Sequence, residues 1–318
     1  MYKKSGLITY YALTPVHTGA GSSVSYIDLP VQRERHTSFP IMAGSGLKGV
    51  FRALAERDDS FKNDVNRIFG PENGSEGSSC VAFTDAKILL YPVRSVRNIF
   101  AWITCPYVLK RFKEDLASAS GKKNNFSIPE VSDDKIILAS NSSLIINNKP
   151  KKVGLEEFVF DVDNTQNADN LINAIKEYIP ATETTQNLSE RLAIVSDNVF
   201  SDLVNYAVEV RTRIKIDQTT GTASGKALFV VEMVPSESIF YSLVFADDPK
   251  NSNNNLVKNV DEVINNIQKM IDNNKVIQVG GDETIGLGFV KVNFINLIKD
   301  EAKNSSLSAS LILKNIEK

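Results

Sequence analysis

The residues best suited to catalysis lie close together near the start of the chain. Both histidines, His17 and His36, fall between residues 15 and 52, and Asp28 is an isolated acid in an uncharged run. A carboxylate can bind a divalent metal ion or act as a general base, and a nearby imidazole can move a proton or hydrogen-bond a phosphate. Asp28 and His17 are therefore candidates for phosphodiester cleavage. A plain loop acid and a structural histidine are the alternatives.

Firm metal binding calls for a second acid besides Asp28. The candidates are Glu232 and Glu237, which lie far away in the sequence, around the returning strand of a predicted hairpin. The residue types alone do not choose between them. We therefore predict Asp28 as the metal ligand and either Glu232 or Glu237 as its partner in catalysis.

A glycine-rich loop opens an amphipathic helix at residues 44–49, with the sequence G-S-G-L-K-G. The run matches G-x-G-x-x-G, but the preceding strand and the acid at the end of a second strand that a dinucleotide site needs are not in place. A helix N-terminus of this kind still favours an anion through its free amides and its dipole. Lys48 and Arg52 share a face and extend the site along a phosphate backbone. We predict phosphate contacts at Gly44, Ser45, Lys48 and Arg52; a solvated helix face is the alternative.

Three further groups of residues are candidates for contact with nucleic acid. Two arginines flank Glu34 just after the Asp28 loop, and a strand near residue 212 alternates apolar residues with cations, which places a basic stripe on one face. A second glycine loop, residues 280–288, lacks the ending of a P-loop, so it does not support ATP hydrolysis. This loop is either a tight turn or a close approach to phosphate. The predicted RNA-binding residues in these groups are Arg33, Arg35, Arg211, Arg213, Lys215, Gly280 and Gly281.

The composition excludes several classes of protein. No apolar run reaches membrane-spanning length, so we expect a cytoplasmic protein without a membrane partner. Cys80 and Cys105 lack metal-binding spacing and are expected to be buried thiols. The net charge of −2 argues against a protein that coats nucleic acid through an overall positive charge. The content of 8% aromatic residues argues against broad recognition by base stacking. Any RNA binding would therefore follow a local basic path.

The hydrophobic pattern predicts a mixed order of strands and helices. Strands are expected at residues 6–13, 81–90, 155–162, 238–246, 275–279 and 289–294, and helices at 45–54, 65–69, 107–116, 168–179, 188–206 and 256–271. Residues 117–152 are polar and are interpreted as an insertion with short strands near positions 136 and 144. Residues 207–234 predict a long β-hairpin with a loose tip. The order is compatible with a βαββαβ core that carries large insertions.

Several motifs, taken in order, resemble a known family. The runs TPVHTGAG, YIDLPVQRE and SFPIMAGSGLKGVFR at one end, and VRTRIKIDQTTGTASGKALFVVEMVPSES and GGDETIGLGFVKV at the other, are similar to the backbone subunit of type III-B CRISPR effector complexes, the Cmr complexes, in the RAMP superfamily. Residues 117–205 match least. Each motif alone is weak, and their order and spacing make the match specific.

The resemblance implies an α+β protein with a ferredoxin-like (RRM-like) core, forming one RAMP-type domain over residues 1–318 with an insertion at about 117–205. Residues 207–234 would form the hairpin that we call the thumb. Copies would stack as a helical filament on a guide RNA beside other Cmr subunits and would cut guide-paired target RNA at regular intervals with Mg²⁺ or Mn²⁺. By match to the motifs, Asp28 is essential for the cut, His17 contributes, Lys48 binds guide backbone, and Glu232 or Glu237 assists.

Three alternatives to this function stay open on the sequence alone. A non-cutting scaffold would share the fold and the filament but lack catalysis. A guide-processing endoribonuclease of the same superfamily would act as a single copy and would want a clearer set of catalytic histidines. A nucleotide-dependent metabolic enzyme is disfavoured because both glycine motifs are incomplete.

Overall fold

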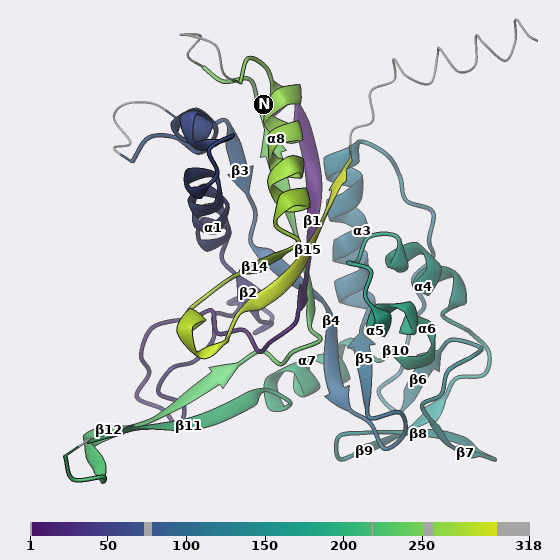
Figure 1. The fold of residues 1–318 in the computed structure, drawn as a ribbon. Helices are drawn as coiled ribbons and strands as arrows, with labels where there is room; N and C mark the ends of the chain where they lie inside the picture. The colour runs from purple at the N-terminus through teal and green to yellow at the C-terminus, as the bar shows by residue number, and fades with distance from the viewer. Residues whose placement is uncertain (1, 73–77, 218, 251–256, 298–318) are drawn as a thin grey trace, which may run out of the picture.

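The computed structural model describes residues 2–72, 78–217, 219–250 and 257–297, and it shows a mixed α+β protein (Figure 1). The strands are β1 (Lys4–Ala12), β2 (Ile41–Met42), β3 (Val81–Phe83), β4 (Ala86–Arg94), β5 (Phe100–Thr104), β6 (Lys135–Leu138), β7 (Ile145–Asn148), β8 (Lys151–Leu155), β9 (Phe158–Val162), β10 (Leu192–Ile194), β11 (Glu209–Ile216), β12 (Ala223–Met233), β13 (Ile239–Ala246), β14 (Val276–Gln278) and β15 (Phe289–Asn296). The helices are α1 (Gly44–Arg57), α2 (Val65–Phe69), α3 (Pro106–Ser120), α4 (Asp169–Lys176), α5 (Glu183–Gln186), α6 (Leu188–Arg191), α7 (Asp197–Tyr206) and α8 (Val260–Asn273), with 3-10 turns at Lys62–Asp64 and Glu283–Ile285.

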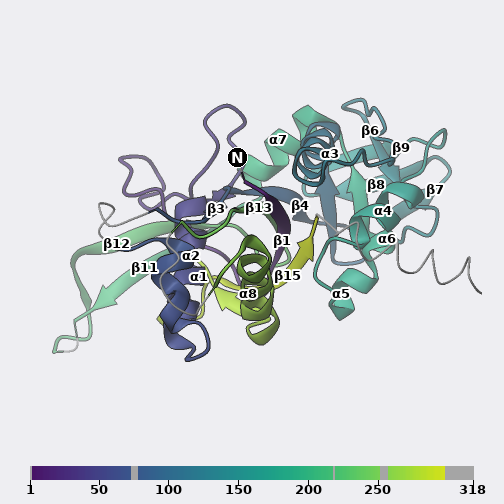
Figure 2. The ribbon, with the colours of Figure 1, turned by 90° about the horizontal axis from the view of Figure 1, so that it is seen from above.

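The centre of the molecule is an antiparallel sheet in the order β15-β1-β13-β4. Strand β1 is buried on both faces, which its almost uncharged sequence allows. Opposite residues of an antiparallel pair point to the same face, so Thr9 and Tyr241 share one side. Tyr241 packs there against Phe112 of α3. Helices α1 and α8 lie on the other side (Figure 2).

The region 117–205 extends this sheet. Strand β5, which precedes this region, pairs with β4, and β10, β6, β9, β8 and β7 of the region continue the sheet beyond it, with α4 and α6 beside them. Two predictions here are wrong. The helix expected over 188–206 is interrupted by β10, because the apolar run at 192–195 fills a buried position parallel to β5. The strand expected over 155–162 starts too early: residue 155 ends β8, the chain reverses at Glu156, whose φ is 49°, and only Phe158–Val162 forms the strand β9.

The thumb is a separate two-stranded sheet of β11 and β12 that projects from the body (Figure 1). The predicted alternation is confirmed: Glu209, Arg211 and Arg213 point to one face together with Phe229 and Val231. The other face carries Val210, Ile214 and Leu228, all exposed. The thumb thus has little core of its own, and it is held mainly at its root.

The buried apolar residues form one main cluster that spans the central sheet and the 117–205 region. Cys80 and Cys105 are both buried free thiols, as predicted. Burial raises the pKa of the Cys80 thiol to about 11 and also raises the pKa of Cys105. Over the described residues, no helix has the length and apolar character needed to cross a bilayer.

Candidate functional site

The candidate catalytic loop, residues 16–33, is paired to the edge of β12 that faces away from β11. Val16 forms an antiparallel bridge with Val234, and Leu29 forms a parallel bridge with Val231. The two arms of the loop also bond to each other, since Gly19 bridges Val31. Both ends of the loop are therefore fixed to the root of the thumb.

Asp28 is attached to β12 by its backbone and its side chain. The Asp28 amide donates to the carbonyl of Val230 at 3.1 Å, and carboxylate oxygen Oδ2 accepts from the amide of Val230 at 2.7 Å. The side chain is half-buried, and Oδ1 has no hydrogen-bond partner among the described residues. One oxygen thus positions the carboxylate and the other is available for chemistry.

His17 lies on the same edge of β12. Its Nδ1 donates to the carbonyl oxygen of Glu232 at 2.8 Å. Since a carbonyl only accepts, the neutral ring carries its proton on Nδ1 and leaves Nε2 as an acceptor. Nε2 lies beside Gly19, where a Cβ atom would come within 3.0 Å of it. The Cα atoms of Val230 and Glu232 are about 7 Å apart along a strand, so Asp28 and His17 are held near each other.

The second glycine loop holds the backbone of His17. The amide of Gly281 donates to the His17 carbonyl at 2.9 Å, and Gly280 adopts φ +87° with no room for a Cβ, which would lie 2.4 Å from that carbonyl oxygen. Arg213 of the thumb binds Asp282 at 2.7 Å, and Leu287 packs on Val231 and Met233. The glycines are thus explained by packing against the catalytic loop. Their contact with RNA stays a prediction.

The Glu232 carboxylate fixes the segment that follows Asp28 in the loop. The Glu232 side chain is 5% exposed. Oε2 accepts from the amide of Val31 at 2.9 Å, and Oε1 pairs with Arg33 at 2.5 Å. The Arg33 guanidinium also donates to the carbonyl of Ser38 at 2.8 Å and to Asn205 at 3.1 Å. Both carboxylate oxygens are occupied, so the geometry gives Glu232 a positioning role.

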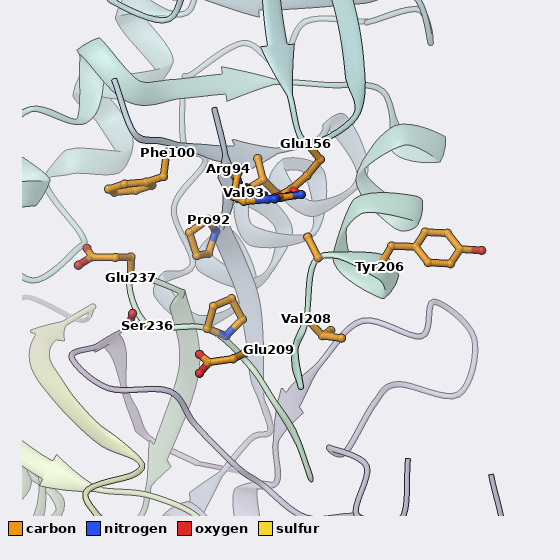
Figure 3. A pocket seen from close by; sticks show the side chains of 12 residues that line it. Pro92, Val93, Arg94, Phe100, Glu156, Tyr206, Val208, Glu209, Ser236 and Glu237 are labelled. Atoms are coloured by element: carbon orange, nitrogen blue, oxygen red, sulfur yellow. Dashed lines mark hydrogen bonds and ion pairs between the residues drawn. The ribbon is translucent and has the colours of Figure 1, made fainter. Parts of the chain in front are cut away.

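Glu237 lies outside the group formed by Asp28, His17 and Glu232. It lies in the turn after β12 with φ +72°, and its carboxylate accepts from the hydroxyl of Tyr11. Its carbonyl accepts from the indole of Trp102 at 2.7 Å. Glu237 and Phe100 line one side of a cavity of about 520 Å³, and Tyr206 lies on the opposite side with its ring directed outward (Figure 3). The structure brings together Asp28, His17 and Glu232, and it gives Glu237 partners outside that group.

The N-terminus of α1 offers two unpaired amides. The Gly44 amide donates to Asp85 at 2.8 Å, and Gly44 is buried so tightly that a Cβ would lie 2.4 Å from the carbonyl of Phe83. The amides of Ser45 and Gly46 have no partner among the described residues, and both residues are exposed. Burial, and then the charge of Arg52, hold the pKa of Lys48 below its usual value. Ser45 and Lys48 therefore form the accessible part of this anion site.

Some of the other predicted RNA-binding cations are paired with groups of the protein, and others are not. Arg52 binds Glu56 at 2.8 Å, Asn66 at 3.0 Å and the carbonyl of Gly70. Arg211 pairs with Glu209 on the exposed surface of the thumb. Arg35 is exposed, with no partner among the described residues. The side chain of Lys215 lies outside the described residues. Their RNA contacts stay predictions.

The protein does not form a complete metal site by itself in the described ranges, which contain no group of three or more Asp, Glu, His or Cys side chains suited to a metal ion. Asp28 Oδ1 is a suitable single ligand. Mg²⁺ is commonly bound by one or two carboxylates together with substrate phosphates and water. The residues therefore fit a metal shared between Asp28 and an RNA phosphate.

Comparison with known proteins gives the family. Residues 9–291 match the RAMP superfamily. The chain belongs to the RAMP superfamily. It is 39% identical over 296 residues to the CRISPR system Cmr endoribonuclease Cmr4 of Pyrococcus furiosus, covering 91% of this chain and 95% of that one. It is 26% identical to the CRISPR system CMR subunit Cmr4 of Saccharolobus solfataricus, covering 91% and 99%.

Solved structures of the superfamily share the fold. The crystal structure of oligomeric Cmr4 from Pyrococcus furiosus is 32% identical, with a TM-score of 0.69 over 93% of this chain and 99% of that one. The cryo-EM structure of the type III-B Cmr-beta bound to cognate target RNA contains a chain with a TM-score of 0.70 at 21% identity, covering 92% and 98%. This second likeness concerns the fold alone.

Sequence reasoning missed several residues that shape the site. Asp85 caps α1 from the end of a neighbouring strand, and Asn205 binds Arg33 from the end of α7. An acid two residues after the strand Val81–Phe83 was a usable signal, because acids favour helix N-termini. Asn205 carried no signal, since its partner is 172 residues away.

Proposed function

We propose that this protein is the repeated, guide-binding subunit of a type III-B CRISPR effector complex and an endoribonuclease that cuts guide-paired target RNA at regular intervals. The observation that supports it most is the arrangement of Asp28 and His17 on one edge of the thumb strand β12. It occurs in a chain 39% identical to a protein named as the Cmr endoribonuclease. The partners would be guide RNA, target RNA, sister copies and other Cmr subunits.

The cut follows from the free atoms of the two side chains. Asp28 Oδ1 accepts the proton of the 2′-hydroxyl, whose oxygen attacks the adjacent phosphate. His17 in its doubly protonated form gives the Nε2 proton to the leaving 5′-oxygen, and its Nδ1–H bond to the Glu232 carbonyl orients the ring. The products are a 2′,3′-cyclic phosphate and a 5′-hydroxyl. The thumb supplies in-line geometry by displacing a nucleotide next to this loop.

We also propose that a divalent ion, Mg²⁺ or Mn²⁺, can assist with Asp28 as its protein ligand; Oδ1 would then hold the ion instead of accepting the proton, which would pass to water. When bound, it would neutralise charge on the phosphate and favour deprotonation of the hydroxyl. Asp28 Oδ2 stays bonded to the Val230 amide in this arrangement, so the carboxylate does not need to turn.

The finer description of the fold is part of the proposal. The order β15-β1-β13-β4, with α1 and α8 on one side, supports a ferredoxin-like core in which α1 and α8 are the crossover helices. The shared apolar cluster supports one domain over the described residues. Ser45 and Lys48 would hold guide phosphates, and the complex would act in the cytoplasm.

A target RNA with one 2′-deoxy nucleotide at a mapped cut position tests the chemistry. We expect the assembled complex to leave that position intact and to cut the other positions normally. Cleavage at the deoxy position would exclude attack by the 2′-hydroxyl. A complex that binds guide and target but cuts nowhere would identify a scaffold, and a single copy per guide would favour a processing enzyme.

A further inference from the structure

The loop that carries Asp28 displays two apolar side chains at its tip. Tyr26 is 86% exposed and Val24 is fully exposed. The remaining tip residues are the serines at positions 22, 23 and 25 and the half-buried Ile27, and Tyr26 has no hydrogen bond, ion pair or ring contact within the described chain. Single apolar residues on a surface are ordinary. The position of this one, two residues before the candidate catalytic acid, gives it significance.

The tip is exposed but its base is fixed. The Ala20 amide donates to the Pro30 carbonyl at 2.9 Å, and the Ser23 amide donates to the Asp28 carbonyl at 2.8 Å. Ser25 adds bonds across the tip, from its hydroxyl to the carbonyl of Ile27 at 3.3 Å. Two residues span at most about 7 Å, so the Cα atom of Tyr26 lies within that distance of the Cα atom of Asp28. A nucleotide bound at this loop could therefore meet both the Tyr26 ring and the Asp28 carboxylate.

We propose that Tyr26 stacks on the nucleobase of target RNA next to the phosphate that is cut. The inference rests on the proposed function and deepens it by naming a substrate-positioning residue. A base has an aromatic face whatever its identity, so stacking suits a protein that cuts many target sequences. The ring would hold the displaced nucleotide while Asp28 Oδ1 reaches its 2′-hydroxyl.

The chemistry of the tip favours a base over a protein partner as the occupant. The tip from Ser22 to Ile27 has no charged side chain, and a phenol ring beside serines suits a flat, uncharged ligand with hydrogen-bonding edges. The nearest acid, Asp28, is the residue that must meet the ribose. A base stacked two residues away is consistent with that placement.

Single-turnover cleavage by the assembled complex tests the role of the ring. We expect Tyr26→Ala to lower the cleavage rate roughly 5- to 150-fold at saturating complex, the range for loss of one base stack. Tyr26→Phe and Tyr26→Trp should restore most of the rate, because only the ring is needed. Tyr206→Ala is the matched control, because Tyr206 is another exposed tyrosine. A complex with this variant should cut at the rate of the unmodified complex.

A spectroscopic measurement separates stacking from other roles. The probe is a target RNA with 2-aminopurine beside the cut position, bound to a complex that carries Asp28→Asn. The 2-aminopurine fluorescence should be quenched when Tyr26 is present and should be brighter in the Tyr26→Ala variant. Equal brightness, or equal rates for the Ala, Phe and unmodified proteins, would overturn the stacking role while the proposed cleavage stands. Loss of filament assembly with Tyr26→Ala would also overturn it, by making the ring a protein contact. An unmodified complex that never cuts would instead refute the proposed function.

Discussion

Replacing Glu232 separates a positioning role from a chemical one. Glu232 is buried, and its ion pair with Arg33 is 2.5 Å long, with the Arg33 side chain 20% exposed. Breaking a buried pair from one side costs about 3–5 kcal/mol, because a charge is left without its partner. Arg33 keeps two acceptors, Ser38 and Asn205, so we take the lower end, about 3 kcal/mol, for Glu232→Ala. The glutamine variant keeps an acceptor for Val31 but removes the charge that faces Arg33, so it should cost about 2 kcal/mol.

These costs convert into melting temperatures. At roughly 2–4 °C per kcal/mol for a chain of this size class, Glu232→Ala should melt roughly 6–12 °C lower and Glu232→Gln roughly 4–8 °C lower. Glu209→Ala is the matched control, because it removes an exposed partner of Arg211 on the same hairpin. An exposed pair contributes about 0–1 kcal/mol, so little change is expected.

The cleavage rate gives the decisive comparison. A positioning role predicts that Glu232→Gln cuts within about tenfold of the unmodified protein, while a lost general acid or base costs about 10²–10⁴-fold. The assay is single-turnover cleavage of labelled target by the reconstituted complex, with guide loading measured in parallel. A glutamine variant that is folded at the assay temperature and loads guide normally but cuts as poorly as Asp28→Asn would refute the positioning role and make Glu232 part of the chemistry.

Two further predictions concern glycine packing and the guide site. Gly280→Ala should lower stability and cleavage more than Gly286→Ala: both positions have positive φ and share a strain of about 1–2 kcal/mol, but only Gly280 meets the His17 carbonyl. Equal melting temperatures and rates for the two variants would contradict this. For Lys48, whose pKa is held low by burial, guide affinity should fall as pH rises through that lowered pKa, because only the charged ammonium attracts phosphate. Lys48→Arg should remove this pH dependence in a titration with a 2′-O-methyl guide, and the same alkaline loss in both proteins would exclude Lys48 from the guide site.

Local patterns predicted much of the fold because they reflect which face of an element is buried. The spacing of Leu47, Val50, Phe51 and Leu54 identified α1, and strict alternation identified β11. The same logic was wrong at residues 192–195, where a short buried apolar run has no period that separates a strand from a helix. The type of such a run is decided by its neighbours, here β5 and β6.

The candidate site was predictable in its residue types but not in its assembly. Asp28 and His17 are brought together by backbone bonds to β12, about 200 residues later in the chain, and backbone groups leave no trace in a side-chain pattern. Glu232 and Glu237 were indistinguishable in sequence. They differ because Glu232 lies on the paired strand and reaches Arg33, whereas Glu237 lies past its end and reaches Tyr11.

The most direct test of the proposed function is the single-turnover cleavage rate of a complex carrying Asp28→Asn. Asparagine has nearly the same shape and its amide oxygen still accepts from the Val230 amide, so the loop, guide loading and filament should be unchanged. With the charge on Oδ1 gone, cleavage at every regular position should fall about 10²–10⁴-fold. A variant that cuts paired target at the normal rate would contradict the assignment of Asp28 as the residue that carries the cut.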